Sequence, residues 1–372
     1  MNRLFAAIVV SAAASGFTHY GPVGPAYAGV PLPTIAQAGV QTVAPVLKRI
    51  TPAIISIAIK GQITDGARKR EIRSTGSGVV FDAGQGLVIT NNHVIDRADE
   101  ITVTLADGRN LPAKRIGGDA DTDIAVIKVE PANLTAIPLG DSDQLEVGDF
   151  VLAIGNPLQL GQTVTSGIVS GLHRNNVGIE RYEDFIQTDA AIYPGNSGGA
   201  LVSLRGELIG INTAFVGSSN ANPGAGFAIP INMARNVADQ ILEFGEVRRG
   251  SLGITIDDAT PGVLRELKLP ASAAAAPIGA MIVKVDGASA GGRAGLKSGD
   301  LVTELGKTAI RDSADLRIRM ALLRVGEVAE LTVMRDGKPM TIRATIAPGS
   351  DQRGGDQRAN QQRASEQRAK SR

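Results

Sequence analysis

The sequence contains no cysteine and only three histidines, His19, His93 and His173. The absence of cysteine excludes disulfide frameworks, thiolate metal sites, cysteine nucleophiles and a lipid-modified cysteine. The scarcity of histidine argues against a multi-histidine metal centre. We therefore expect neither a metal nor a cofactor, and any nucleophile must be an oxygen or an amine.

An excess of charge and a long hydrophobic run are also absent. The 38 Lys and Arg residues nearly balance the 37 Asp and Glu residues, for a formal net charge of +1. This balance argues against a nucleic-acid partner bound by global charge and against an acidic disordered chain. The apolar run at residues 4–14 is shorter than the roughly 20 residues that span a bilayer. We expect no transmembrane segment once the N-terminus is processed.

The two ends of the chain differ from its middle. Arg3, the apolar run and Ala26-Tyr27-Ala28 follow the order of a secretory signal with a small-residue cleavage site. This predicts a signal peptide over 1–28, a linker over 29–41 and export of the mature chain. From residue 349 a Gln-Arg pair recurs with almost no apolar side chain beyond alanine. Such a composition predicts a disordered tail over 349–372, solvated rather than acting as a tether for anionic polymers.

The region 42–248 consists of short runs rich in β-branched residues between Gly, Asn and Asp turns. This pattern predicts a mainly β domain, a barrel or sandwich rather than alternating βα units. Helices are expected only over 43–48 and 231–244, the second with Asn232 as its cap and Gly245 as its stop. Strands are expected at 54–59, 78–81, 87–90, 101–105, 124–129, 150–154, 167–171, 208–213 and 226–229, and around Ile186.

A second, smaller α+β unit is expected over 249–348. Its strands are predicted at 281–285, 301–305, 328–335 and 340–346. A helix capped by Asp312 is expected to run to about Leu323, with Gly326 just past its end. The alanine-rich stretch at 271–276 is predicted to be a flexible insertion.

The motif Gly195-Asn196-Ser197-Gly198-Gly199 places a serine among glycines. Glycines allow the sharp turn that points successive N–H groups at one spot, as in an oxyanion hole. The pattern also fits the nucleophile elbow of α/β-hydrolases, but those enzymes need a histidine after the serine, and none follows Ser197. The orders His…Asp…Ser and Asp…His…Ser remain, and the strand-rich pattern disfavours the second, subtilisin-like one.

His93 is the stronger candidate for a general base. It ends an apolar strand, where a scaffold can present a side chain to a cleft, whereas His173 lies in a polar segment where exposure is the default. Of the nearby carboxylates, Asp123 directly precedes the apolar strand 124–127, which should carry it into the core. Asp119 and Asp121 fit ordinary turn chemistry.

Three motifs in this order resemble the signature set of the HtrA (DegP/DegQ-type) serine proteases. They are Thr90-Asn91-Asn92-His93-Val94-Ile95, Asp123-Ile124-Ala125-Val126-Ile127-Lys128-Val129, and Thr188-Asp189-Ala190-Ala191 leading into the serine motif. The resemblance covers about residues 42–348. It implies a chymotrypsin-like double β-barrel over 42–248, with His93, Asp123 and Ser197 as catalytic residues and an oxyanion hole from the backbone of Gly195, Ser197 and Asn196. The sequence departs from the family at Tyr193, where Asn is usual, and at Ala200, where Pro is usual.

Residues 249–348 resemble the PDZ domain that follows the protease in this family. Leu252-Gly253-Ile254 is similar to the loop that receives a peptide carboxylate, and the strand through Thr255 and Ile256 should offer its edge for β-augmentation. Leu316 and Met320 are expected to wall the groove. The alternative is a domain that merely packs on the protease. Because large cages in this family depend on a second PDZ domain, the resemblance implies the family's homotrimer here rather than a cage.

The resemblance extends to substrate choice. In chymotrypsin-like proteases the residue six before the serine lies at the base of the specificity pocket, which here is Ala191. An uncharged base predicts cleavage after small or medium aliphatic residues. The stretch Thr213-Ala214-Phe215-Val216 is expected to pair with the substrate backbone.

The sequence therefore predicts a periplasmic, ATP-independent serine endopeptidase of protein quality control. Its expected partners are unfolded polypeptides and peptide C-termini. The alternative is a holdase chaperone or peptide-binding regulator with a latent protease domain.

Overall fold

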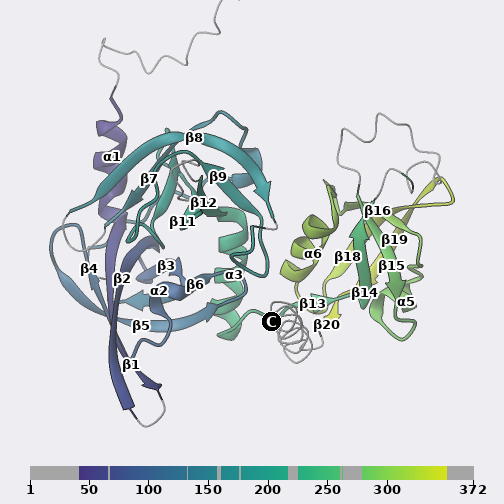
Figure 1. Cartoon of the computed structure of the whole chain (residues 1–372), viewed down its shortest axis with the longest axis horizontal. Coiled ribbons are helices and arrows are strands. Elements are labelled where there is room, and N and C mark those ends of the chain that lie inside the picture. Colours follow the sequence, from purple (N-terminus) through teal and green to yellow (C-terminus); the bar gives the residue numbers. More distant parts are fainter. Residues whose placement is uncertain are drawn as a thin grey trace, which may run out of the picture. The chain divides into compact units, whose positions relative to one another are not determined.

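The computed structural model describes residues 42–349 apart from 66–67, 132, 157–160, 176, 217–224, 260–261 and 263–278 (Figure 1). The expected signal peptide, the linker, the alanine-rich insertion and the tail beyond residue 349 lie outside the described residues, as does His19.

Six antiparallel strands close into a first barrel in the order β1-β2-β3-β6-β5-β4. A short helix, α1 (Ala44–Ile50), and a 3-10 turn, η1 (Thr51–Ala53), lead into it, and α2 (Asn92–Ile95) follows its third strand. The strands are β1 (Ile54–Asp65), β2 (Arg68–Asp82), β3 (Leu87–Asn91), β4 (Glu100–Thr104), β5 (Asn110–Asp119) and β6 (Ile124–Val129).

A second closed barrel follows, in the order β10-β11-β12-β9-β8-β7. A 3-10 turn, η2 (Ser142–Gln144), precedes it. Its strands are β7 (Phe150–Gly155), β8 (Thr163–Arg174), β9 (Phe185–Thr188), β10 (Ala200–Ser203), β11 (Leu208–Val216) and β12 (Ala225–Pro230).

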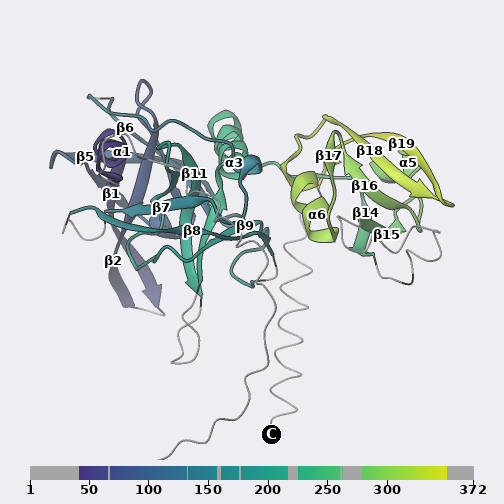
Figure 2. The same ribbon diagram turned by 90° about the horizontal axis from the view of Figure 1, so that it is seen from above.

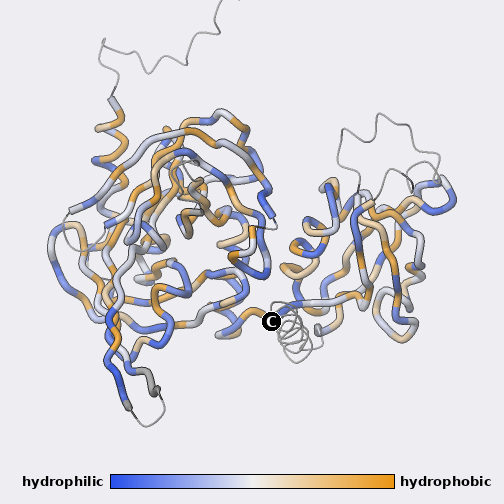
Figure 3. The backbone as a smooth tube through the Cα atoms, viewed as in Figure 1, coloured by the Kyte–Doolittle hydropathy of each residue, from blue (hydrophilic) through white to orange (hydrophobic). Residues whose placement is uncertain are grey.

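The barrel strands are apolar on both faces because each face has its own core. Successive side chains of a strand point to opposite faces. In β7, Val151 and Ala153 belong to the core of the second barrel, whereas Leu152 and Ile154 belong to a cluster shared by both barrels. In β1, Ile55 lies in the core of the first barrel. Figure 3 shows apolar residues along the strands of both barrels.

Helix α3 (Ile231–Phe244) packs against the shared cluster and contacts strands of both barrels (Figure 2). Its buried residues recur every three or four positions, the spacing of one helix face. The helix ends at Gly245, whose left-handed φ of 76° lets its N–H donate to Ile241 O at 2.8 Å. The buried residues are Ile231, Met233, Ala234, Val237, Ala238, Gln240 and Ile241.

The second unit is a small α+β domain. Its sheet has the order β14-β15-β16-β18-β19, with β17 paired to β16, and β13 pairs separately with β20. In helix α6 the N-cap Asp312 accepts the N–H of Asp315 at 2.7 Å. The elements are β13 (Gly250–Ser251), β14 (Ile254–Asp258), β15 (Ala280–Val285), α5 (Ala290–Ala294), β16 (Leu301–Leu305), β17 (Thr308–Ala309), α6 (Ser313–Leu322), β18 (Val328–Arg335), β19 (Lys338–Thr345) and β20 (Ala347–Pro348).

The mainly β class, the double barrel and the α+β unit are confirmed. The sequence pattern predicts neither β5, which has only two buried residues, nor β10, which has only four residues. The expected cap at Asn232 is wrong. The N-cap is Pro230, two residues earlier, and the Asn232 side chain instead donates to Asp141 at 2.7 Å.

Across the part of the chain that the structure describes, no helix combines the length and hydrophobicity needed to cross a bilayer.

Phe185 tests the cluster shared by the barrels. Its side chain is buried, and its ring lies 5.8 Å from that of Phe227. We expect Phe185→Ala to lower the free energy of unfolding by about 3–5 kcal/mol, because it leaves a cavity among packed side chains. Phe150→Ala is the control, since that ring is 45% exposed. Urea denaturation followed by circular dichroism compares the two, and equal midpoints would contradict this packing role.

Candidate active site

His93 and Asp123 meet at the ends of two neighbouring strands. β3 and β6 pair with Asn91 opposite Ile124, so the residues just beyond this pair are brought together. The His93 N–H donates to Asp123 Oδ1 at 2.9 Å, and His93 Nδ1 lies 2.7 Å from Oδ2. With the carboxylate accepting from Nδ1, the neutral ring carries its lone pair on Nε2. The Asp123 side chain is 4% exposed and that of His93 is 53% exposed, so a buried anion orients an accessible base.

The backbone of Asp123 is in a left-handed conformation, with φ of 56°. This conformation costs a non-glycine residue about 1–3 kcal/mol. The Asp123 carbonyl accepts the Asn92 N–H at 3.1 Å and the Asn91 side-chain amide at 3.0 Å. These hydrogen bonds offset the strain and hold the carboxylate towards His93.

Thr213 adds a third donor to the carboxylate, and it comes from the other barrel. Its hydroxyl donates to Asp123 Oδ2 at 2.8 Å. The pairing of β11 with β12 shifts register between Asn212 and Ala214, so Thr213 occupies a bulge. A bulge re-aims one side chain relative to a regular strand. The sequence predicts only substrate pairing for Thr213, because no local pattern signals this contact.

Ser197 lies next to the same bulge. Its hydroxyl donates to the Thr213 carbonyl at 3.1 Å. No hydrogen bond joins Ser197 to His93 among the described residues. Hydrogen bonds between a nucleophile and its base are often long without substrate, so the hydroxyl must exchange the carbonyl for Nε2 before reaction.

The loop that carries Ser197 is held by Ser77 in β2 of the first barrel. The Ser77 hydroxyl donates to Gly195 O at 2.6 Å, and its N–H donates to Ser197 O at 2.8 Å. Gly198 has φ of 79°, and a Cβ there would lie 2.2 Å from Ser77 O and 2.3 Å from Thr90 Oγ1. Glycine is therefore required at this position. The serine motif gives no signal that identifies Ser77 as its partner.

Two N–H groups of this loop are available to an oxyanion. In the described part of the chain, neither the Gly195 N–H nor the Ser197 N–H has an acceptor. The resemblance also implies the N–H of Asn196 as an oxyanion donor, but this N–H donates to Tyr193 O at 2.9 Å. Asn196 is thus not an oxyanion donor in this geometry, and its side chain is buried.

A cavity of about 770 Å³ opens beside Ser197. Ala191 and Ile192 both line it, although no sequence motif points to Ile192. Ile192 is 3% exposed, and its Cδ1 would lie 3.0 Å from a Cβ at Gly226. The wall between these residues is therefore apolar. The lining residues are Thr188, Asp189, Ala190, Ala191, Ile192, Tyr193, Pro194, Ser197, Thr213, Phe215 and Gly226.

Two residues at the rim differ in character from the wall. Asp189 lines the cavity, but its Oδ1 accepts the Ile168 N–H at 2.7 Å, so that oxygen is tied to β8. Tyr193 is 57% exposed. Ala214, Phe215 and Val216 complete the end of β11, where Phe215 is paired with Gly226.

The electrostatics favour a charged form of His93. Burial lowers its pKa, but the hydrogen bond and charge of Asp123 and the charge of Glu180 outweigh burial, so the pKa of His93 is raised. Burial raises the pKa of Glu180 to about 7, and the negative charge of Asp123 adds to this effect. Glu180 is a second carboxyl group that acts on the pair, and no sequence motif identified it.

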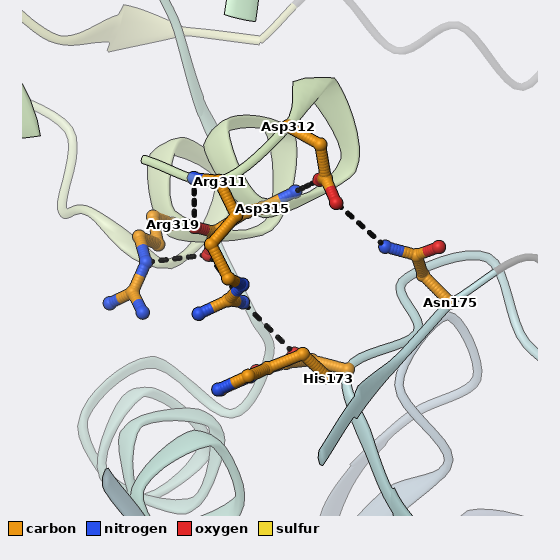
Figure 4. A network of polar contacts seen from close by, with 7 residues as sticks. His173, Asn175, Arg311, Asp312, Asp315 and Arg319 are labelled. Carbon is orange, nitrogen blue, oxygen red and sulfur yellow. Dashed lines mark hydrogen bonds and ion pairs between the residues drawn. The ribbon is translucent and has the colours of Figure 1, made fainter. Parts of the chain in front are cut away.

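His173 is not a simple exposed residue. Its Nδ1 lies 2.9 Å from Asp184 Oδ1, and Arg311 Nη2 lies 3.4 Å from the same oxygen. Arg311 also pairs with Asp315 of α6, at 2.9 Å (Figure 4). The carboxylate partner of His173 is thus shared with an arginine, and this histidine takes no part in the His93–Asp123 pair.

The seven residues expected to bind a peptide lie in the second unit around β14. β14 is an edge strand, which leaves one side of its backbone open for β-augmentation. Gly253 has φ of 67°, and its N–H donates to Ser251 Oγ at 3.0 Å. Thr255 is exposed. One apolar cluster contains Leu252, Ile254, Ile256, Leu316 and Met320.

Comparison with protein families and known proteins gives a consistent result. The trypsin-like peptidase domain model matches residues 76–211, and the PDZ domain model matches residues 250–346. The chain is 41% identical over 339 residues to the periplasmic pH-dependent serine endoprotease DegQ of Escherichia coli (strain K12), covering 86% of this chain and 73% of the relative. It is 40% identical over 353 residues to the periplasmic serine endoprotease DegP of the same strain, covering 84% and 73%.

Solved structures agree. The HtrA-type protease AlgW with a tripeptide matches with a TM-score of 0.67 and 40% identity, over 84% of this chain and 99% of that chain. The serine endoprotease from Yersinia pestis matches with a TM-score of 0.56 and 33% identity, over 84% and 99%.

Glu180→Gln tests the electrostatics of the site. The anionic form of Glu180, populated above its pKa of about 7, raises the pKa of His93. Its removal lowers that pKa, so the acidic limb of the pH profile of kcat/KM for peptide hydrolysis should move to lower pH. Glu130→Gln, at an exposed position, is the control and should leave the profile unchanged. Coincident profiles for Glu180→Gln and wild type would contradict the effect of Glu180 on the pKa of His93.

Proposed function

This chain belongs to the HtrA family of serine endopeptidases, and we propose that it is an ATP-independent protease that degrades unfolded polypeptides after small aliphatic residues. The observation that carries the proposal is the buried Asp123 carboxylate, which holds His93 in the first barrel and Thr213 in the second beside Ser197. We propose the protease domain over 42–248 and the PDZ domain over 249–348.

The roles we propose follow from these contacts. His93 Nε2 accepts the proton of Ser197 as its Oγ attacks the substrate carbonyl, and the imidazolium is stabilised by Asp123. The N–H groups of Gly195 and Ser197 stabilise the oxyanion, an effect worth about 3–4 kcal/mol per donor. His93 then gives its proton to the leaving amine. Deacylation by water repeats the same steps.

The shape of the cavity supports the proposed specificity. Ala191 and the buried Ile192 present apolar surface, and Asp189 Oδ1 is already hydrogen-bonded to β8. Valine or alanine fits this apolar wall better than a long cationic side chain does, and the hydrogen bond to β8 holds the Asp189 carboxylate away from that wall. The end of β11, from Thr213 through Phe215 to Val216, supplies backbone groups for the substrate.

We propose that the PDZ domain binds peptide C-termini along β14, with Leu252 and Gly253 at the carboxylate end. The edge position of β14 supports this. The related protease AlgW has a solved structure with a tripeptide, which supports peptide binding by a protein of this kind. DegP and DegQ are periplasmic, which supports a periplasmic location and a signal peptide over 1–28. A homotrimer is the proposed assembly. The holdase alternative has less support, because the relatives are endoproteases.

Casein digestion tests the nucleophile. Unfolded casein should be degraded by the wild type, and Ser197→Ala should slow degradation on the order of 10⁴-fold or more, because the attacking oxygen is lost. Gel electrophoresis follows the loss of intact casein over time with the wild type and with Ser197→Ala at equal protease concentration. Equal digestion would refute the assignment of Ser197. If neither digests casein but both suppress its aggregation, the protein is a holdase.

Peptides that differ only at the residue before the cleaved bond test the pocket. The wild type should prefer Val to Phe, and Arg should be poor. Ile192→Ala enlarges the pocket and should lower the Val-to-Phe ratio of kcat/KM by about tenfold. Ile192→Val, which removes one methyl group, is the matched control and should change the ratio by much less. A wild-type preference for Arg would contradict the pocket assignment.

A further inference from the structure

We infer that Arg249 is a positioning residue for catalysis, which clamps the turn that carries Asp123. This inference rests on the catalytic role proposed for Asp123. Arg249 follows α3 and immediately precedes β13, 126 positions after Asp123 in the chain (249 − 123). The motifs of the serine protease give no reason to connect these two residues.

The contact between Arg249 and the turn is a buried, two-pronged ion pair. Arg249 Nη1 donates to Asp119 Oδ1 at 3.0 Å and Nη2 donates to Oδ2 at 2.6 Å. The side chains of Arg249 and Asp119 are 18% and 9% exposed. Fork-to-fork geometry fixes orientation as well as distance, which a lysine cannot reproduce. Arg249 therefore determines where the Asp119 carboxylate lies.

Asp119 in turn holds the chain next to the catalytic aspartate. It is the last residue of β5, and Ile124 opposite it is the first residue of β6. Asp119 Oδ2 accepts the Thr122 N–H at 3.1 Å and the Thr122 hydroxyl at 2.5 Å. Thr122 directly precedes Asp123, which must keep its left-handed φ of 56° to reach His93. The chain of contacts runs from Arg249 through Asp119 and Thr122 to Asp123.

Arg249 also ties this turn to the segment around Glu180. Its guanidinium lies 4.6 Å from the centre of the Tyr182 ring and 3.4 Å from Asp121. The Tyr182 N–H donates to Asp121 O at 3.0 Å. The buried Glu183 accepts three backbone N–H groups of its own segment, from Val177, Ile179 and Glu180, at 2.6–2.9 Å. One arginine thus contacts both the turn that precedes Asp123 and the segment that carries Glu180.

The test compares Arg249→Gln with Arg248→Gln. Arg248 is the adjacent arginine, and its side chain is 55% exposed. Among the described residues, its one ion pair is with the exposed Glu246, at 3.6 Å. Steady-state kinetics use a short peptide with valine before the cleaved bond. Arg249→Gln should lower kcat by about tenfold or more with less than about a twofold change in KM, because small misplacements of catalytic groups cost about 10²-fold. Arg248→Gln should remain within about twofold of the wild type.

Three further measurements separate positioning from general destabilisation. In Arg249→Gln the acidic limb of the pH profile should move to lower pH, because a displaced Asp123 raises the pKa of His93 less. Asp119→Asn should show the same loss, and the double variant Asp119→Asn/Arg249→Gln should lose no more than the worse single variant. Arg249→Lys keeps the charge without the fork and should be intermediate. If Arg249→Gln does not fold, the same kcat and pH-profile measurements are made on Arg249→Lys.

Peptide binding is measured too, because Arg249 adjoins the loop of Leu252 and Gly253. In a Ser197→Ala background, the Kd for a C-terminal peptide should be unchanged by Arg249→Gln. Wild-type kcat and pH profile in a folded Arg249→Gln protein, additive losses in the double variant, or full recovery of kcat with saturating peptide would each overturn the inference. An inactive wild type would instead refute the proposed function.

Discussion

A single buried carboxylate is the constraint on which the active site depends. Asp123 accepts two hydrogen bonds from His93 in the first barrel and one from Thr213 in the second. An unpaired charge at this depth would cost several kcal/mol, so the barrels must meet in the register that supplies all three donors. The shared apolar cluster brings the barrels together, and the carboxylate selects the arrangement in which they are active. Ser77, which holds the loop of Ser197 from the opposite barrel, makes the same demand from the other side.

The reacting groups lie where regular structure is interrupted. Asp123 has a left-handed backbone, Gly195 and Gly198 have positive φ, and Thr213 lies in a bulge. Regular β-pairing would point the Thr213 hydroxyl elsewhere and would occupy the N–H groups of Gly195 and Ser197. The closed barrels supply enough hydrogen bonds and buried apolar surface to hold these few irregular positions. The strain is local, whereas the scaffold that sustains it is distributed over twelve strands.

Much of this protein can be predicted from its sequence, for physical reasons. With one histidine at the end of an apolar strand, no histidine after Ser197 and one aspartate at the start of a core strand, few catalytic arrangements remain. Apolar runs indicate most of the strands, but they do not indicate β5, because only two of its residues, Gly117 and Asp119, are buried and neither is apolar and large. The contacts of Thr213, Ser77, Glu180 and Arg249 were also missed. Each joins positions far apart in the chain, so it depends on the folded arrangement rather than on a local pattern.

The closed barrels have a consequence for a protease that handles unfolded chains. An open sheet presents a row of unpaired N–H and C=O groups to which any extended polypeptide can add. Both barrels close on themselves, so such an edge is limited to strand ends that extend past their neighbour, such as the end of β11, whereas β14 in the second unit is an edge strand. Closed barrels therefore limit the surface of the catalytic domain on which extended, aggregation-prone substrate chains could add as extra strands. The end of β11 and the edge of β14 are the two places where the proposed function uses backbone pairing, one to cut the bound strand and the other to recognise its end.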